Sequence, residues 1–390
     1  MIYSFSTARV VFGIGARAGV ATQAAHLGKR CLLVTGSRAA RCDWLLENLR
    51  EVMDEVASVA ICGEPETAFI SAQAEAARRA GCDVVVAIGG GSVIDAGKAL
   101  AALAANTGDL FDYLEVVGRG LPLEHDPLPM IAVPTTAGTG AEVTANAVLL
   151  SPAHGVKASL RAPGLIPSLA IVDPELAVSL PPRQTAASGM DALTQLMETF
   201  VSHAASPLTD PLCRDGLTRA ARSLRIAVQD GADLRARSDM ALAALFSGMA
   251  LANARLGAVH GFAAPLGAML GAAHGEICAS LLPFVMEANI RNLRRSAPKH
   301  PALARYDEVG RILTGTEGAA ATEGVEFVRT LCRDLGVRGL AALGLTEGLM
   351  EDVVEKAARA SSMHGNPIVL ARDELLGILR QAMGEGASFS

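Results

Sequence analysis

The segment 82–106, CDVVVAIGGGSVIDAGKALAALAAN, decides the fold of this chain. Its β-branched run from Val84 to Ile88 predicts a buried strand, the glycines that follow predict a tight turn, and the alanine-rich remainder predicts a helix. Strand, turn and helix in this order are typical of a parallel sheet with helices on both faces. Backbone amides in such a turn, together with the positive end of the helix, can hold a pyrophosphate.

The same alternation of strand and helix surrounds this segment. Further strands are expected in RCLLVTG at 30–36, SVAIC at 58–62 and the start of MIAVPTTAGTGAEVT at 130–144, with helices at 40–56 and 67–80 and a short helix near the end of 130–144. From about Leu180 the β-branched clusters vanish and helix-length patterns continue to the end. We therefore expect an α/β dinucleotide-binding domain over residues 1–179 and an all-helical domain over residues 180–390.

Composition limits the kinds of partner. A formal net charge of −6 with no run of lysine or arginine argues against nucleic acid. Charged residues and glycines interrupt the apolar stretches 84–105 and 241–273, so we expect buried elements there and no membrane. The seven cysteines are scattered without a C-x-x-C pair, and the N-terminus lacks the pattern of a signal peptide. A cytoplasmic protein is expected.

Two glycine-rich turns are candidates for binding a dinucleotide. The first comprises Gly89, Gly90, Gly91 and Ser92; it is not the G-x-G-x-x-G fingerprint, and a plain tight turn is the alternative explanation. The second, PTTAGTGAEVT at 134–144, offers hydroxyls and amides at the end of another strand. Loops at the ends of neighbouring parallel strands bind ligands in α/β sheets, so the pair favours a nucleotide site.

The end of the strand at 30–36 bears on the choice of cofactor. Gly36 stands where an aspartate would pair with the adenosine 2′-hydroxyl of NAD, and Ser37 and Arg38 could bind a 2′-phosphate instead. An exposed arginine with no ligand is the alternative. Both NAD and NADP therefore remain candidates.

Four residues in the second half form a candidate metal site. Asp191 and Gln195 lie one turn apart, about 6 Å, in a helix expected from about Met190 to Ser202 after a break at 188–189. His260 and His274 are each followed by glycine, and fourteen residues of straight helix would hold them about 21 Å apart. The chain must therefore turn between them for both to reach one ion.

The chemistry of these four side chains suits a divalent cation. A carboxylate and two imidazoles are strong ligands, and the amide oxygen of Gln195 is a weaker one. The alternative is that both histidines are satisfied core residues and that Asp191 only interacts with a helix dipole. Bound metal would act as a Lewis acid on a substrate oxygen.

With these segments together, the chain resembles the iron-containing (group III) alcohol dehydrogenase family. The resemblance rests on ARVVFGIG, GGGSVIDAGKA, PTTAGTGAEVT, VDPELAVSLPP, GMDALTQLMETFVS, GAVHGFAAPLGAMLGAAHG and SSMHGNPIVLARDELLGIL, which together run almost from end to end. It implies a nucleotide-binding domain, a helical domain, and a cleft between them for NAD(P) and a divalent metal. The first glycine motif is shared in looser form with dehydroquinate synthases.

The resemblance also implies roles for individual residues. By motif match, Gly90, Gly91, Ser92 and Asp95 are expected at the pyrophosphate and nicotinamide, Thr135, Thr136, Thr139 and Leu176 at the adenosine and ribose, Lys157 at the cofactor ribose, and Asp191, His260 and His274 at the metal. The implied activity is hydride transfer between NAD(P) and a small alcohol or aldehyde. A homodimer and an Fe²⁺ or Zn²⁺ ion are expected with it.

Two positions depart from the family pattern. Gln195 stands where members commonly have a metal-binding histidine, and Ala264 stands where many have a histidine near the substrate. The first departure weakens the expected hold on the metal, and the second removes a proton carrier. Three alternatives therefore stay open: a metal-independent enzyme similar to maleylacetate reductases, a lyase similar to dehydroquinate synthases, and a nucleotide-binding protein without catalysis.

Overall fold

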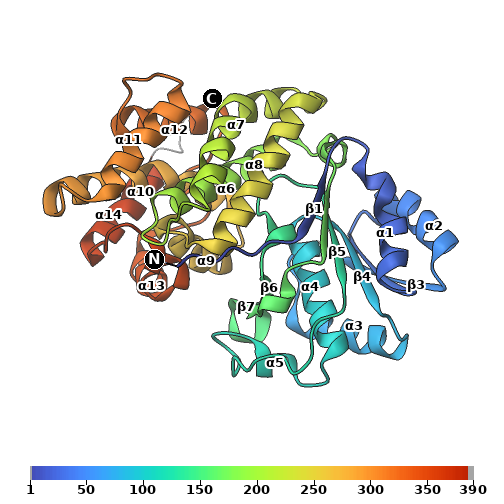
Figure 1. Cartoon of the computed structure of the whole chain (residues 1–390). Helices are drawn as coiled ribbons and strands as arrows, with labels where there is room; N and C mark the ends of the chain where they lie inside the picture. Colours follow the sequence, from blue (N-terminus) through green and yellow to red (C-terminus); the bar gives the residue numbers. More distant parts are fainter. Residues whose placement is uncertain (1, 385–390) are drawn as a thin grey trace. The chain divides into compact units, whose positions relative to one another are not determined.

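The computed structural model describes residues 2–384. They group into two compact units, and Figure 1 labels most of their helices and strands. The sheet unit comprises residues 7–136 and 140–178, and the helical unit comprises residues 2–6, 137–139 and 179–384. The short segment 137–139 belongs to the helical unit although it follows a strand of the sheet unit.

The sheet unit is built on six parallel strands. In spatial order they are β1 (Arg9–Phe12), β8 (Leu169–Val172), β5 (Met130–Pro134), β4 (Val84–Gly89), β2 (Arg30–Gly36) and β3 (Glu55–Ile61). The chain runs from β2 outward to β3 and then crosses back to β4 on the other side of β2. This reversal creates a switch point at the carboxyl ends of β2 and β4, the usual place for a ligand in such sheets.

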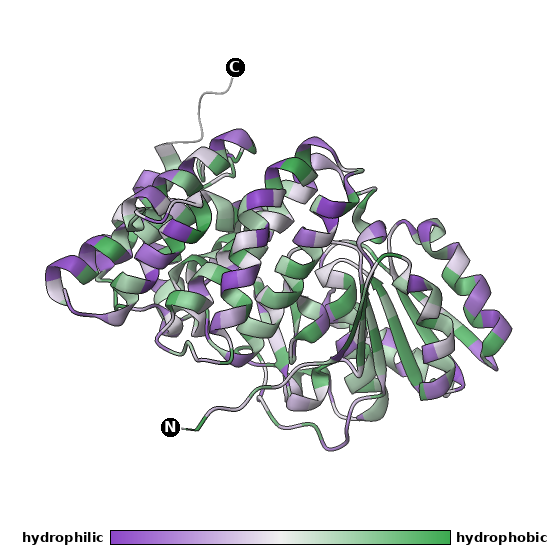
Figure 2. Ribbon diagram, turned by 45° about the horizontal axis from the view of Figure 1, so that its top comes forward, coloured by the Kyte–Doolittle hydropathy of each residue, from purple (hydrophilic) through white to green (hydrophobic). Residues whose placement is uncertain are grey.

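Helices cover both faces of this sheet. They are α1 (Val20–Leu27) and α2 (Asp43–Val52) on one face, and α3 (Thr67–Arg79) and α4 (Gly91–Ala105) on the other. Successive strand residues serve opposite faces: Leu33 of β2 packs in the cluster with α1 and α2, and Leu32 and Val34 pack in the cluster with α3 and α4. Strands buried on both faces are apolar throughout, as the green strands in Figure 2 show.

An antiparallel hairpin of β6 (Asn146–Ser151) and β7 (Val156–Arg161) adds to the cluster of α3 and α4, and the sequence analysis did not predict it. Its turn, Pro152–His154 followed by Gly155 at φ 62°, is not one of the short Asn-Gly or Asp-Gly turns that identify hairpins. This unit also contains the short helix α5 (Leu110–Tyr113).

The described part of the helical unit consists of helices joined by short connections. They are α6 (Pro182–Val201), α7 (Asp210–Gln229), α8 (Leu234–Asn253), α9 (Ala258–Leu270), α10 (His274–Ser296), α11 (Pro301–Thr314), α12 (Ala321–Asp334), α13 (Glu347–Arg359) and α14 (Arg372–Gly384). One large hydrophobic cluster includes residues of every one of these helices. The expected all-helical second half and the α/β first half are both confirmed.

The predicted break at 188–189 is wrong, because α6 runs through these residues as one helix. The hydroxyl of Ser188 donates to the carbonyl of Gln184 at 2.8 Å, a hydrogen bond that a helix accommodates. At Gly189 a Cβ atom would come within 2.2 Å of the Leu224 side chain of α7. The glycine here allows close helix packing and does not end the helix.

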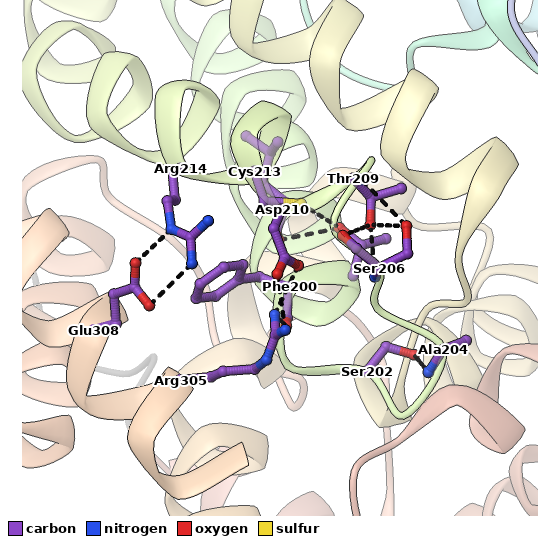
Figure 3. Close-up of polar contacts among 12 residues, drawn as sticks. Phe200, Ser202, Ala204, Ser206, Thr209, Asp210, Cys213, Arg214, Arg305 and Glu308 are labelled. Atoms are coloured by element: carbon purple, nitrogen blue, oxygen red, sulfur yellow. Dashed lines mark hydrogen bonds and ion pairs between the residues drawn. The ribbon is translucent and has the colours of Figure 1, made fainter. Parts of the chain in front are cut away.

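The carboxyl end of α6 is fixed by a cluster of charged side chains (Figure 3). The guanidinium of Arg305 binds both carboxylate oxygens of Asp210 at 2.7 and 2.8 Å and donates to the carbonyl of Phe200 at 2.8 Å. Arg305 and Arg214 both lie over the Phe200 ring, and Arg214 also pairs with Glu308 at 2.5 Å. Cation–π and bidentate contacts of this kind hold α6 in register with its neighbours.

Within residues 2–384, no single helix is both long and apolar enough to cross a bilayer. Helices α8 and α9 reach that length and composition only as a pair, and they are bent by 100° at their junction.

Candidate functional site

Three helices bring the predicted metal ligands together. Asp191 lies in α6, His260 is the third residue of α9, and His274 is the first residue of α10. The turn expected between the histidines occurs at Gly271, whose φ of 63° ends α9. With Cys278 of α10, one ligand atom from each of these side chains lies within 4.8 Å of all the others.

The contacts of Asp191 fit a cation at the centre of this cluster. Its buried Oδ1 finds no hydrogen-bond donor in the described part of the chain, yet lies 3.4 Å from Nε2 of His260 and 3.6 Å from Nε2 of His274. An unsatisfied buried polar atom costs about 1–3 kcal/mol. In a tetrahedral site with bonds of about 2.1 Å, the ligand atoms lie about 3.4 Å apart, so the observed spacing matches a metal centre.

Cys278 is a member of the cluster that the sequence analysis missed. Its Sγ lies 3.7 Å from Nε2 of His274, one helical turn earlier in α10, and 3.9 Å from Nε2 of His260. The signal that could have identified it is the spacing of four residues between His274 and Cys278, which places both side chains on one helix face.

Gln195 follows Asp191 by one turn of α6, as predicted, and is buried. Its amide Oε1 lies 2.8 Å from the hydroxyl of Ser247 in α8, which donates a hydrogen bond to it. Ala264, the other departure from the family pattern, is an exposed residue of α9.

The sequence analysis did not predict Glu198, a second carboxylate of this site, which binds the ring nitrogen of His260 that faces away from Asp191. Oε2 of Glu198 lies 2.7 Å from Nδ1 of His260, and Oε1 accepts the backbone N–H of Val259 at 2.7 Å. Glu198 stands seven residues after Asp191, so both side chains lie on one side of α6. A histidine that binds a metal through one ring nitrogen usually donates the N–H of its other ring nitrogen to a carboxylate, as His260 does to Glu198.

Two buried asparagines complete this support. Oδ1 of Asn366 accepts the backbone N–H of Ala258 at 3.2 Å and the amide of Asn289 at 2.9 Å. Asn289 in turn donates to the hydroxyl of Tyr306 at 3.1 Å. The N-terminus of α9, and with it His260, is therefore fixed by side chains from α6 and α10 and from the segment after the short helix Ser361–Gly365.

The electrostatics of the cluster favour positive charge at its centre. Burial opposes ionisation of Asp191, but the imidazoles of His274 and His260 outweigh it and lower the pKa of this carboxyl. Burial also opposes protonation of both imidazoles, but Cys278 and Asp191 outweigh it, so the pKa of His260 lies well above its usual value and the pKa of His274 is raised. A site that attracts protons in this way also attracts a metal ion.

In the sheet unit, the predicted phosphate-binding turn lies between β4 and α4. A Cβ atom at Gly89 would come within 2.6 Å of Val93, so glycine is required for the tight passage from strand to helix. Gly90 is the N-cap of α4, which begins at Gly91, so the glycine turn presents first-turn amides without a capping side chain. These are the groups that bind phosphate at helix N-termini.

Other predicted cofactor residues gather at the same edge of the sheet. Gly36 ends β2, and Thr135 follows β5 and donates its N–H to the carbonyl of Gly89 at 2.9 Å. Thr136 lies beside Gly90, where a Cβ atom would approach its methyl group to 3.4 Å. The carboxyl ends of three neighbouring strands therefore meet at the switch point.

The remaining predicted residues have other partners or lie elsewhere. Asp95, on the first turns of α4, accepts the N–H of Val148 at 3.2 Å, and burial raises its pKa to about 6. Lys157 of β7 forms an ion pair with Glu64 at 2.9 Å. Ser37 is exposed just after β2, and Ser92 lies in the first turn of α4. Leu176 packs in the hydrophobic cluster of α1 and α2, and Thr139 lies in the segment 137–139, which belongs to the helical unit.

Family models match nearly the whole chain. The model described as iron-containing alcohol dehydrogenase matches residues 7–174, and the model of the C-terminal domain of the same family matches residues 185–383. This chain belongs to the iron-containing alcohol dehydrogenase family. The two matches fall on the sequence that forms the sheet and the sequence that forms the helices.

Individual members of the iron-containing alcohol dehydrogenase family match over most of their length. The 1,3-propanediol dehydrogenase of Klebsiella pneumoniae is 36% identical over 364 residues, which are 91% of this chain and 92% of the relative. A solved 1,3-propanediol oxidoreductase is 32% identical with a TM-score of 0.89, covering 98% of this chain and 100% of its own. An archaeal alcohol dehydrogenase from a Red Sea brine pool is 26% identical with a TM-score of 0.90, covering 98% of each chain.

These comparisons confirm the predicted family, fold class and reaction class. The chain is an oxidoreductase that acts on CH–OH groups, and its family implies a metal and a nicotinamide cofactor. They lend no support to a maleylacetate reductase, a dehydroquinate synthase or a binding protein without catalysis.

Proposed function

We propose that this alcohol dehydrogenase interconverts a small alcohol and its aldehyde, using NAD(P) and a divalent metal, Fe²⁺ or Zn²⁺, held by Asp191, His260 and His274. The observation that supports it is the buried, unpartnered Oδ1 of Asp191 facing the Nε2 atoms of both histidines. When bound, the metal would supply Lewis acidity, and the nicotinamide would accept the hydride in alcohol oxidation and donate it in aldehyde reduction.

The protein orients the ring of His260 and leaves only part of the cluster exposed to solvent. Glu198 accepts the proton of Nδ1 of His260, which leaves the lone pair of Nε2 directed toward Asp191. The side chain of His274 is 37% exposed, while Asp191 and His260 are almost fully buried. We therefore propose that substrate reaches the cluster from the side of His274.

When the alcohol is oxidised, its hydroxyl proton must be carried away by a group other than the side chain at position 264, where many family members have a histidine. Ala264 has no proton to exchange, so we propose that water or a cofactor ribose hydroxyl carries the proton. Lys157 is our candidate to bind that ribose; its ammonium group is held near Glu64 at 2.9 Å. An ammonium beside the ribose would favour the ionised hydroxyl.

For the cofactor we propose that both NAD and NADP are accepted. Gly90, Gly91 and Ser92 are the candidates for the pyrophosphate, at the N-terminus of α4. Gly36, Ser37 and Arg38 follow the end of β2 without a carboxylate to repel a 2′-phosphate, and Ser37 and Arg38 are exposed. Asp95, Thr135, Thr136, Thr139 and Leu176 remain candidates for the other parts of the cofactor.

We also propose a homodimer formed through the free edge of the sheet. In the described sheet β1 is an edge strand, paired with β8 alone. Its Val11 and Phe12 are 37% and 36% exposed, and Ile14 just beyond is 58% exposed. An exposed apolar edge strand is a site for pairing with another chain. Light scattering after size exclusion tests this, and Val11→Lys should shift the protein toward monomer.

Metal analysis combined with cofactor oxidation tests the central proposal. Freshly purified protein should contain about one equivalent of metal and should oxidise NADH or NADPH in the presence of at least one member of an aldehyde panel. Asp191→Ala and His274→Ala should lose activity and metal while still binding cofactor. Full activity after exhaustive chelation, or unchanged activity in both variants, would contradict the proposal.

A further inference from the structure

Cys278 lies in the same cluster as the three predicted metal ligands, although the family pattern does not predict a ligand there. We infer that Cys278, and not Gln195, completes the set formed by Asp191, His260 and His274, and that the site takes Zn²⁺ in preference to Fe²⁺. This inference rests on the proposed function, because it concerns the same metal. It assigns the fourth ligand and, through that ligand, the identity of the ion.

Geometry is the first argument for Cys278. Zinc–sulfur bonds of about 2.3 Å and zinc–nitrogen bonds of about 2.1 Å place tetrahedral sulfur and nitrogen ligands about 3.6 Å apart. Sγ of Cys278 lies 3.7 Å from Nε2 of His274 and 3.9 Å from Nε2 of His260. The oxygen of Asp191 lies 3.4 and 3.6 Å from the same two nitrogens. All four separations are close to the edge lengths of one coordination tetrahedron.

The second argument is that the oxygen of Gln195 already has a partner. Ser247 lies 2.8 Å from this oxygen and donates a hydrogen bond to it, within a buried environment. A neutral amide oxygen is also a weak ligand for Fe²⁺ or Zn²⁺. The loss of the usual histidine at position 195 is therefore compensated by the thiol on α10, and not by the glutamine that replaced the histidine.

Charge balance is the third argument. Asp191 and a thiolate at Cys278 together carry two negative charges, which neutralise a divalent ion in a site where both side chains are buried. With Gln195 in place of Cys278, one positive charge would stay uncompensated in the same surroundings, at a high desolvation cost. On binding, the thiol proton passes to solvent, because thiolate is the ligating form.

The thiolate also determines which ion is preferred. Soft sulfur ligands select zinc among the ions proposed here, and zinc lies above Fe²⁺ in the general order of affinities. The set of one oxygen, two nitrogens and one sulfur resembles the ligand mixtures of zinc sites more than those of oxygen-rich sites. The partly exposed His274 leaves one side of the cluster open to a further ligand.

Cobalt substitution tests the inference without any measurement of activity. Co²⁺ is added to the metal-depleted full-length protein, and the near-ultraviolet charge-transfer band between sulfur and cobalt is recorded. Wild type, Gln195→Ala and the matched cysteine control Cys332→Ser should all show the band, and Cys278→Ser should lack it. In competition with a chelator, Cys278→Ser should hold Zn²⁺ at least about ten-fold more weakly.

The outcomes separate this inference from the proposed function. If wild type binds one Co²⁺ without a sulfur band, Cys278 is not a ligand, while the metal centre itself stands. If wild type binds no Co²⁺, or Asp191→Ala binds it equally well, both proposals fail. The inference is also overturned if Cys278→Ser keeps the band or if wild type prefers Fe²⁺ to Zn²⁺ in direct competition. The wild-type spectrum alone is decisive should Cys278→Ser fail to fold.

Discussion

Glu198 and His260 are joined by a contact of 2.7 Å between Oε2 and Nδ1, and the other oxygen of Glu198 caps the start of α9 at the N–H of Val259. One buried carboxylate thus fixes both the position of the helix that carries His260 and the tautomer of its ring. Because Nδ1 carries the donated proton, Nε2 is left as a lone-pair donor facing Asp191.

Replacing Glu198 with glutamine should therefore reverse the tautomer. A glutamine amide facing Nδ1 would donate a hydrogen bond to it, which places the ring proton on Nε2, where the metal should bind. We expect Glu198→Gln to weaken Zn²⁺ binding about 10- to 100-fold with little change in folding. Chelator competition measures the affinity, and Glu287→Gln, which alters a partly exposed ion pair between α10 and Arg329 of α12, is the control. Equal affinities in the two variants would show that Glu198 does not set the tautomer.

The glycines after the two histidines should differ in their tolerance of a methyl group. At Gly275 a Cβ atom would come within 2.1 Å of the backbone oxygen of Ala187 in α6, so α10 would have to move away from the helix of Asp191. At Gly261 the closest atom, at 2.8 Å, is the flexible methyl end of Met363. We expect Gly275→Ala to lose about 1–3 kcal/mol of stability together with metal affinity, and Gly261→Ala to lose less of both.

Urea denaturation and chelator competition on both variants provide the measurement. A variant at 275 that binds metal normally would mean that the approach of α10 to α6 does not position His274.

Much of the fold could be predicted because it depends on local patterns. β2 spans Arg30–Gly36, the same seven residues that the sequence RCLLVTG predicts as a strand, and α3 ends one residue before its predicted end. The sequence also predicts Asp191, His260 and His274 as candidate ligands, because a carboxylate and two imidazoles are ligand types that a divalent cation prefers and because their motifs resemble those of the family.

What could not be predicted depends on distant contacts. Glu198 and Cys278 belong to the site because α6, α9 and α10 converge. Their spacing from Asp191 and His274 places them on the same helix faces as those residues, but it does not show that the faces meet. The low helix propensity of Gly189 predicts a helix break, yet close packing against Leu224 outweighs that cost of about 1 kcal/mol. The sequence predicts Gln195 as a possible weak ligand, because the hydrogen bond from Ser247 to its oxygen depends on the packing of α8 against α6.

Introducing a carboxylate at the end of β2 should change the preference between the two nicotinamide cofactors. A Cβ atom at Gly36 would meet only an ordinary contact at 3.7 Å, so Gly36→Asp fits without backbone strain. The new charge would accept a hydrogen bond from the 2′-hydroxyl of NAD and repel the 2′-phosphate of NADP. We expect the ratio of kcat/KM for NADPH over NADH to fall about ten-fold or more, which corresponds to about 1.4 kcal/mol. Gly36→Asn is the uncharged control, and an unchanged ratio would place the adenosine ribose elsewhere.

A buried carboxylate in the sheet unit should make the stability of the protein depend on pH. Burial raises the pKa of Glu142 from 4.5 to about 7, with Lys98 nearby acting in the opposite direction. Between these two pKa values the folded protein binds more protons than the unfolded chain, so the stability of the protein should fall as the pH rises. The stabilisation that this proton provides should be lost in full above about pH 7. Burial also raises the pKa of Asp95, to about 6, and this contributes an effect of the same sign. Glu142→Gln imitates the protonated acid, so we expect a flatter profile of Tm against pH and a higher Tm than wild type above neutrality. A lower Tm for this variant at both ends of the range would mean that the ionised carboxylate stabilises the fold through Lys98.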